Sequence, residues 1–292
     1  MYKHIVTTVI VFAAAFTAAA ASPEAYRLFD NNGREVTFQE MADSLGRAEV
    51  VFIGENHNCP ISHWMELEIT RALHTRHGAA LTIGEEMLEA DNQLLVDEYM
   101  HRLIDYDRFE AEARLWDNYA TDYYPVVFYA KDNGIPLVAT NIPRRYASVV
   151  KNKGFEGLDS LSDEAKRYMA PLPVPFSFDN EKSQAAFGMM QAMGGRTSGD
   201  TERLAQAQAM KDATMAWFIS RHMDGGVFLH INGSYHSDNR EGIIPYLLRY
   251  RPGTRIATVT SVRQDQIATL DPDNLGRADF YIAVPEDFPT SY

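Results

Sequence analysis

Cysteine is nearly absent from this sequence. Cys59 is the single cysteine among 292 residues, so the chain cannot form an internal disulfide and its core must hold the fold together. Hydrophobic residues make up 46% of the chain, which is enough for a large core. Because Cys59 precedes Pro60, we expect it to be a small residue in a tight turn; the alternatives are a thiolate ligand or a reactive thiol.

Positive charge is also scarce. The chain has 27 lysines and arginines against 40 aspartates and glutamates, which gives a formal net charge of −13. The phosphates of a nucleic acid would repel so acidic a protein. We therefore expect no nucleic-acid partner.

Long apolar runs are few as well. The run from Ile5 to Phe16 follows Lys3, and the alanines at 19–21 offer small residues at a cleavage site. This layout is typical of a secretory signal peptide and predicts cleavage after residues 1–21, with export of a domain 22–292 to the periplasm or the cell exterior. No cysteine lies near the cleavage point to carry a lipid, and no later stretch is apolar enough to form a transmembrane segment.

The remaining sequence alternates between short β-rich runs and amphipathic stretches. After a small hairpin at residues 26–38, the strands are predicted at 50–54, 79–83, 135–139, 227–231, 255–260 and 280–284. The helices are predicted at 60–77, 91–103, 108–132, 202–223 and 241–249. This alternation predicts an α/β fold, with a mainly parallel β-sheet flanked by helices. Residues from about 154 to 223 are predicted to form a mostly helical insert, a smaller helical subdomain.

Two of the predicted strands end in the same G-x-x-H pattern. Residues 50–53 lead into Gly54-Glu55-Asn56-His57, and residues 227–231 lead into Asn232-Gly233-Ser234-Tyr235-His236. A third strand is followed by Gly84-Glu85-Glu86. In parallel sheets, ligands bind beyond the carboxyl ends of the strands. We therefore expect His57 and His236 to meet beside carboxylates at one edge of the sheet.

Imidazoles and carboxylates together can bind a divalent metal such as zinc or manganese. The expected ligands are His57, His236, Glu55 and Glu86, and Glu55 or Glu86 could act as a general base on a metal-bound water. The alternative is that His57 and His236 only cap helices or link loops. Five other histidines are interpreted as structural: His63, His74, His77, His222 and His230.

Aromatic residues suggest a second kind of site. Tyr119, Tyr123 and Tyr124 follow Trp116 at helical spacing, which is typical of a core or an interface but could also form a flat surface for a porphyrin with a tyrosinate on the iron. Met189, Met190 and Met193 could wall the same cavity. Arg144 follows a strand and could bind a carboxylate, or else pair with Glu55 or Glu86.

Several of these segments, in this order, resemble the ChaN-like haem-binding family, within the wider group of Tiki, TraB and erythromycin-esterase proteins. The resemblance rests on residues 51–57, on Glu86-Met87-Leu88 with Gln93, and on residues 139–144, 206–216, 232–236 and 242–245. It implies a parallel-sheet domain that binds haem, with a tyrosine on the iron and a histidine near the propionates. The chain differs from many relatives because it lacks a cysteine that could carry a lipid. No motif identifies which tyrosine would bind the iron.

The resemblance implies a haem-binding protein of iron uptake, with haem held in a homodimer and an outer-membrane uptake partner. The residues expected at the haem are Tyr119, Tyr123, Tyr124, His57, Arg144, Tyr235 and His236. In the Tiki group, paired G-x-x-H motifs and a glutamate instead form a metal-dependent hydrolytic site, which is the alternative function. A module that only binds another protein, through Trp116 and the tyrosines, is a third hypothesis.

Overall fold

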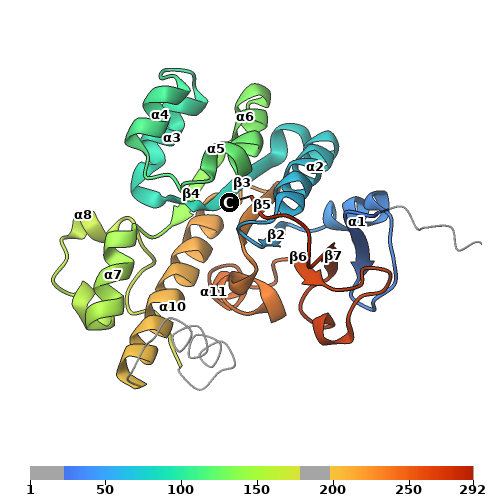
Figure 1. Cartoon of the computed structure of the whole chain (residues 1–292). Helices are drawn as coiled ribbons and strands as arrows, with labels where there is room; N and C mark the ends of the chain where they lie inside the picture. The colour runs from blue at the N-terminus through green and yellow to red at the C-terminus, as the bar shows by residue number, and fades with distance from the viewer. Residues whose placement is uncertain (1–22, 178–197, 292) are drawn as a thin grey trace, which may run out of the picture.

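The protein is built around one β-sheet. The computed structural model describes residues 23–177 and 198–291, so the expected signal peptide and the methionines at 189, 190 and 193 lie outside the described residues. Within the described part, seven strands form one sheet in the order β1-β7-β6-β2-β5-β3-β4 (Figure 1). The strands are β1 (Arg27–Asp30), β2 (Val50–Glu55), β3 (Leu81–Glu89), β4 (Leu137–Asn141), β5 (Val227–Gly233), β6 (Ile256–Gln264) and β7 (Phe280–Pro285).

The sheet is mainly parallel, as the sequence predicts. β2 pairs in parallel with β5 on one side and β6 on the other, and β5 continues to β3 and β4, while β1 runs antiparallel to β7. Every residue of β2 is buried. A strand that is covered on both faces needs an unbroken apolar run, and residues 50–53 supply it.

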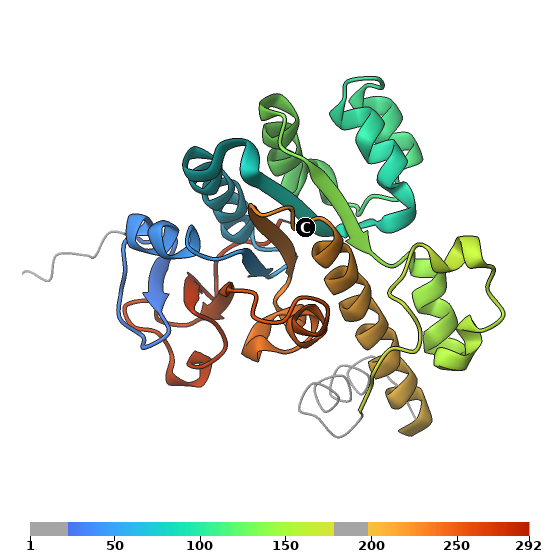
Figure 2. The ribbon, with the colours of Figure 1, turned by 180° about the vertical axis from the view of Figure 1, so that it is seen from behind.

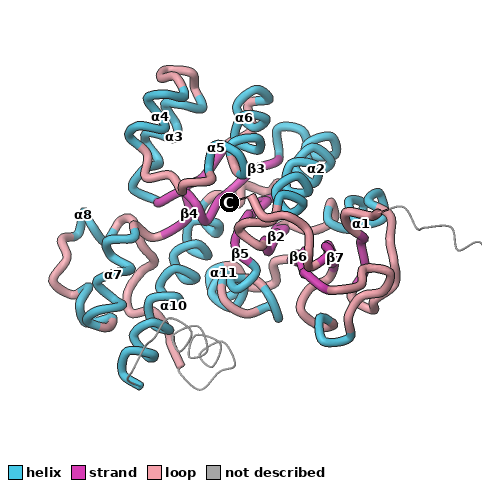
Figure 3. Tube along the Cα trace, viewed as in Figure 1, coloured by secondary structure: helices cyan, strands magenta, loops and turns pink. Residues whose placement is uncertain are grey.

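Helices cover both faces of the sheet (Figures 1 and 2). Val51 and Ile53 of β2 pack in one core with Ile69 of α2, whereas Val50 and Phe52 pack in a second core with Ile219 of α10. Successive strand residues point to opposite faces, so one apolar run serves both cores. Loops and turns separate the helices (Figure 3). The α-helices are α1 (Phe38–Leu45), α2 (Pro60–His77), α3 (Gln93–Met100), α4 (Tyr106–Glu112), α5 (Tyr119–Asp122), α6 (Tyr124–Asn133), α7 (Arg144–Lys153), α8 (Asp163–Lys166), α10 (Ser198–Arg221) and α11 (Ile243–Tyr250).

The expected hairpin at residues 26–38 is mostly wrong. Only an isolated bridge joins Phe29 to Glu35, and helix α1 begins at Phe38. Thr37 caps this helix, since its hydroxyl accepts from the backbone N–H of Glu40 while the Glu40 carboxylate accepts from the N–H of Thr37. The Thr-x-x-Glu capping box was visible in the sequence and outweighs the β propensity of the residues around it.

The expected helix at 108–132 is three shorter helices, α4, α5 and α6, and Pro125 lies in the first turn of the last. The helix expected at 91–103 is α3, which begins at Gln93 after a 3-10 turn and ends at Met100. The strand expected at 79–83 extends as β3 to Glu89, so Glu85 and Glu86 lie within the strand rather than in a loop after it.

The segment from about 154 to 223 contains α8 and the long helix α10, with part of it outside the described residues. Helix α10 packs against β4, α7 and α11, so its buried face adjoins the main sheet (Figure 1). Within residues 23–177 and 198–291, no helix is both long and apolar enough to cross a membrane.

Removal of the cap of α1 should destabilise the protein slightly. Thr37→Ala deletes a side chain that accepts from the helix, and we expect a loss of about 1 kcal/mol in the free energy of unfolding, measured by urea denaturation. Gln39→Ala, an exposed change in the same helix, is the matched control and should stay within about 0.5 kcal/mol of the wild type. Equal stability of the two variants would contradict the capping role.

His230 of β5 should make stability depend on pH. It is a fully buried core histidine, as expected, and bonds Thr140 at 2.9 Å and Asn232 at 2.9 Å. Burial lowers its pKa to about 4, against about 6.5 in the unfolded chain. As pH falls below about 6.5, the unfolded chain binds a proton that the folded chain does not, so this contribution to stability is lost between about pH 6.5 and 4.

The test compares the wild type with His230→Gln, which cannot titrate there. Between pH 7 and pH 4 the wild type should lose about 3 kcal/mol more free energy of unfolding than the variant. Urea unfolding followed by circular dichroism at several pH values measures the difference. Parallel curves for the two proteins would show that folding does not lower the pKa of His230.

Candidate functional site

The carboxyl ends of β2, β5 and β3 bring three functional side chains together. His57 follows β2, His236 lies in the 3-10 turn η4 (Ser234–His236) after β5, and Glu86 belongs to β3 on the other side of β5. The His57 ring lies against Gly233, where an added Cβ would come within 2.8 Å of its Nε2 atom. Glycine at 233 therefore leaves room for the ring, and any larger residue would push it away.

Each of the two histidines is oriented by its own carboxylate. The Nδ1 atom of His57 lies 2.6 Å from Oε1 of Glu55, and Nδ1 of His236 lies 2.6 Å from Oδ1 of Asp212 on α10. The Nε2 atom of His236 is 3.1 Å from Oε1 of Glu86, whose other oxygen accepts from the N–H of Gly233. Such a Nδ1–carboxylate contact fixes the ring and leaves Nε2 for a ligand, as at many metal sites.

The electrostatics of this cluster favour a cation. Burial lowers the pKa of His57 and of His236, but Glu55 and Glu86 for the first, and Glu86 and Asp212 for the second, outweigh it and raise both pKa values. Burial raises the pKa of Glu86, but the charge and hydrogen bond of His236 lower it well below its usual range. The cluster therefore stabilises positive charge in the form of protons or of a metal ion.

Glu55 also contacts a second group of buried polar residues, two of which, His63 and Glu66, lie on α2. Its Oε1 atom accepts from the hydroxyl of Tyr123 at 2.9 Å, and its Oε2 atom lies 3.0 Å from Nδ1 of His63. That same nitrogen lies 3.3 Å from Oε2 of Glu66. The sequence analysis took His63 as structural and overlooked Glu66, although their three-residue spacing places both on one face of the helix.

The Glu55 and Glu66 carboxyls have opposite pKa shifts. Burial raises the pKa of Glu55, but bonds and charge from His57 and His63 lower it to about 2. Burial raises the pKa of Glu66 well above its usual range, and the nearby Glu55 charge raises it further. Burial lowers the pKa of His63, but Glu66 and Glu55 raise it to about 11. Without another cation, protons must therefore balance this group.

Of the three tyrosines expected at a haem iron, two lie inside the protein and Tyr124 is partly buried. Tyr119 and Tyr123 are each 1% exposed, and their hydroxyls donate to Glu85 and Glu55, while the hydroxyl of Tyr124 bonds Tyr99. Burial and the adjacent carboxylates raise the pKa of Tyr119 and of Tyr123 well above the usual range. The helical stripe of Tyr119 and Tyr123 therefore faces the core, and haem ligation by one of these tyrosines stays a prediction.

Arg144, at the start of α7, pairs with a different carboxylate from the ones expected. Its Nε donates to Glu89 at 2.8 Å, and neither Glu55 nor Glu86 is its partner, because β3 continues to Glu89. Arg144 lines a cleft of about 370 Å³ at the sheet edge, with Trp116 and Lys211. The ring centroids of Trp116 and His57 lie 4.8 Å apart, so this cleft adjoins the histidine cluster.

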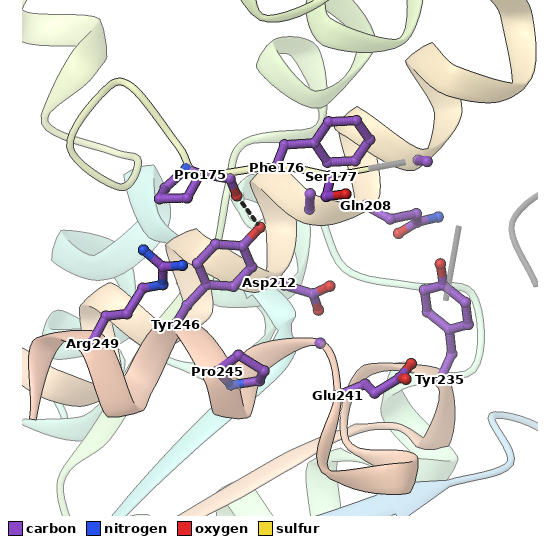
Figure 4. Close-up of a pocket in the computed structure, with 13 residues that line it drawn as sticks. Pro175, Phe176, Ser177, Gln208, Asp212, Tyr235, Glu241, Pro245, Tyr246 and Arg249 are labelled. Carbon is purple, nitrogen blue, oxygen red and sulfur yellow. Dashed lines mark hydrogen bonds between the residues drawn. The ribbon is translucent and has the colours of Figure 1, made fainter. Parts of the chain in front are cut away.

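A larger pocket of about 460 Å³ lies between α10 and α11, and we call it the α10–α11 pocket (Figure 4). Tyr235, which precedes His236, stands at its rim, and Asp212, which orients His236, is part of its wall. Its other lining residues are largely apolar: Pro175, Phe176, Ser177, Ala205, Gln208, Ala209, Glu241, Gly242, Pro245, Tyr246 and Arg249.

Solved structures share this fold. The structure titled "Cofacial heme binding to ChaN of Campylobacter jejuni" matches with a TM-score of 0.69 and 18% identity, over 89% of this chain and 96% of that one. A Bacillus cereus protein matches with a TM-score of 0.52 and 10% identity, over 89% of this chain and 95% of that one. At these identities the likeness shows the fold alone.

Sequence comparison gives a curated relative and a family. Protein RETICULATA-RELATED 5, chloroplastic, of Arabidopsis thaliana is 27% identical over 210 residues, which is 66% of this chain but 28% of that protein. The family described as "Haem-binding uptake, Tiki superfamily, ChaN" matches residues 41–247, well over half of the chain and including both G-x-x-H histidines. The chain therefore belongs to the ChaN family of haem-binding uptake proteins, in the Tiki superfamily.

Proposed function

We propose that this protein binds haem in the α10–α11 pocket and serves haem uptake. Membership of a haem-binding uptake family supports haem as the ligand. The observation that carries the placement is an apolar pocket with a tyrosine, Tyr235, at its rim beside the histidine cluster (Figure 4).

The pocket has the chemistry that a porphyrin needs. Phe176, Pro245 and Tyr246 offer apolar and aromatic surface to a flat ring. Arg249 provides a cation for a propionate group. The volume of about 460 Å³ lies toward the lower end of the range usual for ligand sites, so part of a porphyrin would project from it. A second copy of the chain would cover the projecting part, which makes a homodimer part of this proposal.

Tyr235 is the residue we propose as the iron ligand. Burial raises its pKa above the usual range, and the charges of Asp212 and Glu241 add to this effect. A phenol in this environment loses its proton only when a strong cation takes the place of that proton on the oxygen. Ferric iron is such a cation when haem is bound. The ring centroids of His236 and Tyr235 lie 5.2 Å apart, so a change at the iron ligand would affect the histidine cluster.

Export remains part of the proposal. The basic residues, apolar run and small residues at 1–21 support secretion to the periplasm or the cell exterior. A protein there would receive haem from, or pass it to, an outer-membrane uptake partner. Fractionation of the host cells, followed by amino-terminal sequencing of the protein, tests export and cleavage. An uncleaved chain in the cytoplasm would contradict both.

Haem titration of the full chain tests the ligand and the pocket. We expect a saturable Soret band for the wild type, and for Tyr235→Phe a changed band position with affinity weaker by roughly tenfold or more, equivalent to about 1.4 kcal/mol, because the iron loses a bond. Absorption spectroscopy with a haem titration series measures both.

Tyr246→Phe is the matched control. It makes the same chemical change in the same pocket, but its hydroxyl donates to the carbonyl of Pro175. This variant should keep the wild-type band position. A wild type without saturable haem binding would refute the function, whereas identical spectra for wild type and Tyr235→Phe would refute only the proposed iron ligand.

A second candidate function is metal-dependent hydrolysis at His57, His236 and Glu86. The specific observation is that each histidine binds a carboxylate through Nδ1 at 2.6 Å, which leaves its Nε2 for a metal. A bound divalent ion would supply a Lewis acid and an activated water. The cleft beside Trp116 and Lys211 would then admit the substrate.

Metal analysis tests this second candidate. Protein purified without chelator should contain about one zinc or manganese ion bound to two imidazoles, which His236→Ala should lose. Asp212→Asn should weaken binding by about 10- to 100-fold, because it removes only the carboxylate that orients His236. His222→Ala, just after the end of α10, is the control, because its ring bonds the backbone carbonyl of Phe218. Equal metal content in His236→Ala and the control would exclude this site.

A further inference from the structure

A second cluster of potential ligands lies deeper in the protein than the paired histidines. It consists of Glu55 at the end of β2 and of His63 and Glu66 on α2. All three side chains are buried, with Glu66 at 0% exposure. We call it the α2 triad. It shares Glu55 with the histidine cluster but uses the other oxygen of that carboxylate.

The spacing of the donor atoms suits a metal ion. One nitrogen or oxygen from each residue lies within 4.8 Å of the others. Nδ1 of His63 is 3.0 Å from Oε2 of Glu55 and 3.3 Å from Oε2 of Glu66. Ligand atoms of a tetrahedral ion with bonds of ~2.0 Å lie about 3.3 Å apart. The triad therefore needs little movement to bind an ion.

Two oxygens of the triad have too few partners. Among the described residues, Oε1 of Glu66 is buried and has no hydrogen-bond partner, and the buried Oε2 of Glu55 has beside it only Nδ1 of His63, at 3.0 Å, a nitrogen that it shares with Glu66. A buried carboxylate oxygen without enough partners is costly, and such an atom in a folded protein calls for an ion, a water molecule or a proton beside it. Here both belong to the same small cluster.

The other side of the His63 ring is already engaged. Its Nε2 lies 3.2 Å from the carbonyl oxygen of His57 and 3.3 Å from Oδ2 of Asp122, two acceptors that require a proton on Nε2. In a neutral ring, Nδ1 then presents a lone pair to two carboxylates. Three electron-rich groups facing one point need a cation between them.

We propose that Glu55, His63 and Glu66 bind one divalent transition-metal ion, of the zinc or manganese class. Two carboxylates balance the charge of such an ion, and the imidazole favours a transition metal over calcium or magnesium. Because no ligand of the triad is exposed, the role is structural: the ion would tie the end of β2 to α2 and so position His57. The proposal is independent of haem binding.

Burial also determines how the ion enters. A closed site is filled while the chain folds or while the loop above it opens, so exchange with a chelator should be slow. The experiment therefore compares full chain that is unfolded, stripped of metal and refolded in the presence of zinc. Zinc per chain is measured by elemental analysis after gel filtration, and zinc X-ray absorption spectra count the imidazoles bound.

We expect the wild type to bind zinc and Glu66→Gln to bind one ion fewer per chain. Glutamine keeps the shape of the side chain but removes its charge. Glu68→Gln is the matched control, because Glu68 lies on the same helix but pairs with Arg71 near the surface, and it should bind as much zinc as the wild type. Equal zinc in Glu66→Gln and wild type would overturn the proposal.

The wild-type spectrum decides the matter if Glu66→Gln fails to fold. Zinc in the triad has one imidazole ligand, whereas zinc between His57 and His236 has two. A mean below two imidazoles per zinc supports the triad, and a mean of two, or no bound zinc, overturns it. A chain that binds zinc in the triad but gives no Soret band would refute the haem proposal and leave this one intact.

Discussion

The pairing of β2 with β5 is the interaction on which the rest of the site depends. Residues 50–55 run parallel to residues 228–233, with Gly54 opposite Asn232 and Glu55 opposite Gly233. This register brings the His57 ring onto Gly233 and places the turn that carries His236 beside it. A shift of one residue would turn every side chain of β2 to the opposite face of the sheet and separate the two histidines.

Burial of carboxylates is the second constraint. Glu55, Glu85 and Glu86 are at most 3% exposed at the sheet edge, and a buried charge is stable only with a counter-ion and hydrogen bonds. Glu55 and Glu86 obtain both from histidines, while burial raises the pKa of Glu85 to about 8 and so keeps its proton at neutral pH. One Glu55 carboxylate links the histidine cluster to the α2 triad, so ligand events at either site would affect the other.

The sequence predicted the parallel sheet well because each central strand is an apolar run that only a doubly covered strand can bury. It predicted the meeting of His57 and His236 because parallel strands end at one edge. It did not predict that Tyr119 and Tyr123 pack in the core, since helical spacing shows that aromatics share a face but not whether that face meets a cavity or the core. It also missed Asp212, whose contact with His236 joins residues from separate elements.

The sequence by itself determined the α/β class, the strands that end in G-x-x-H and the membership of a haem-binding family, because these depend on local pattern and order. Only the tertiary structure decided that Glu89 binds Arg144, that Tyr235 borders a pocket, and that His63 and Glu66 face Glu55. The physical reason is that partners distant in the chain are chosen by packing, and hydropathy patterns do not record which buried polar groups will meet.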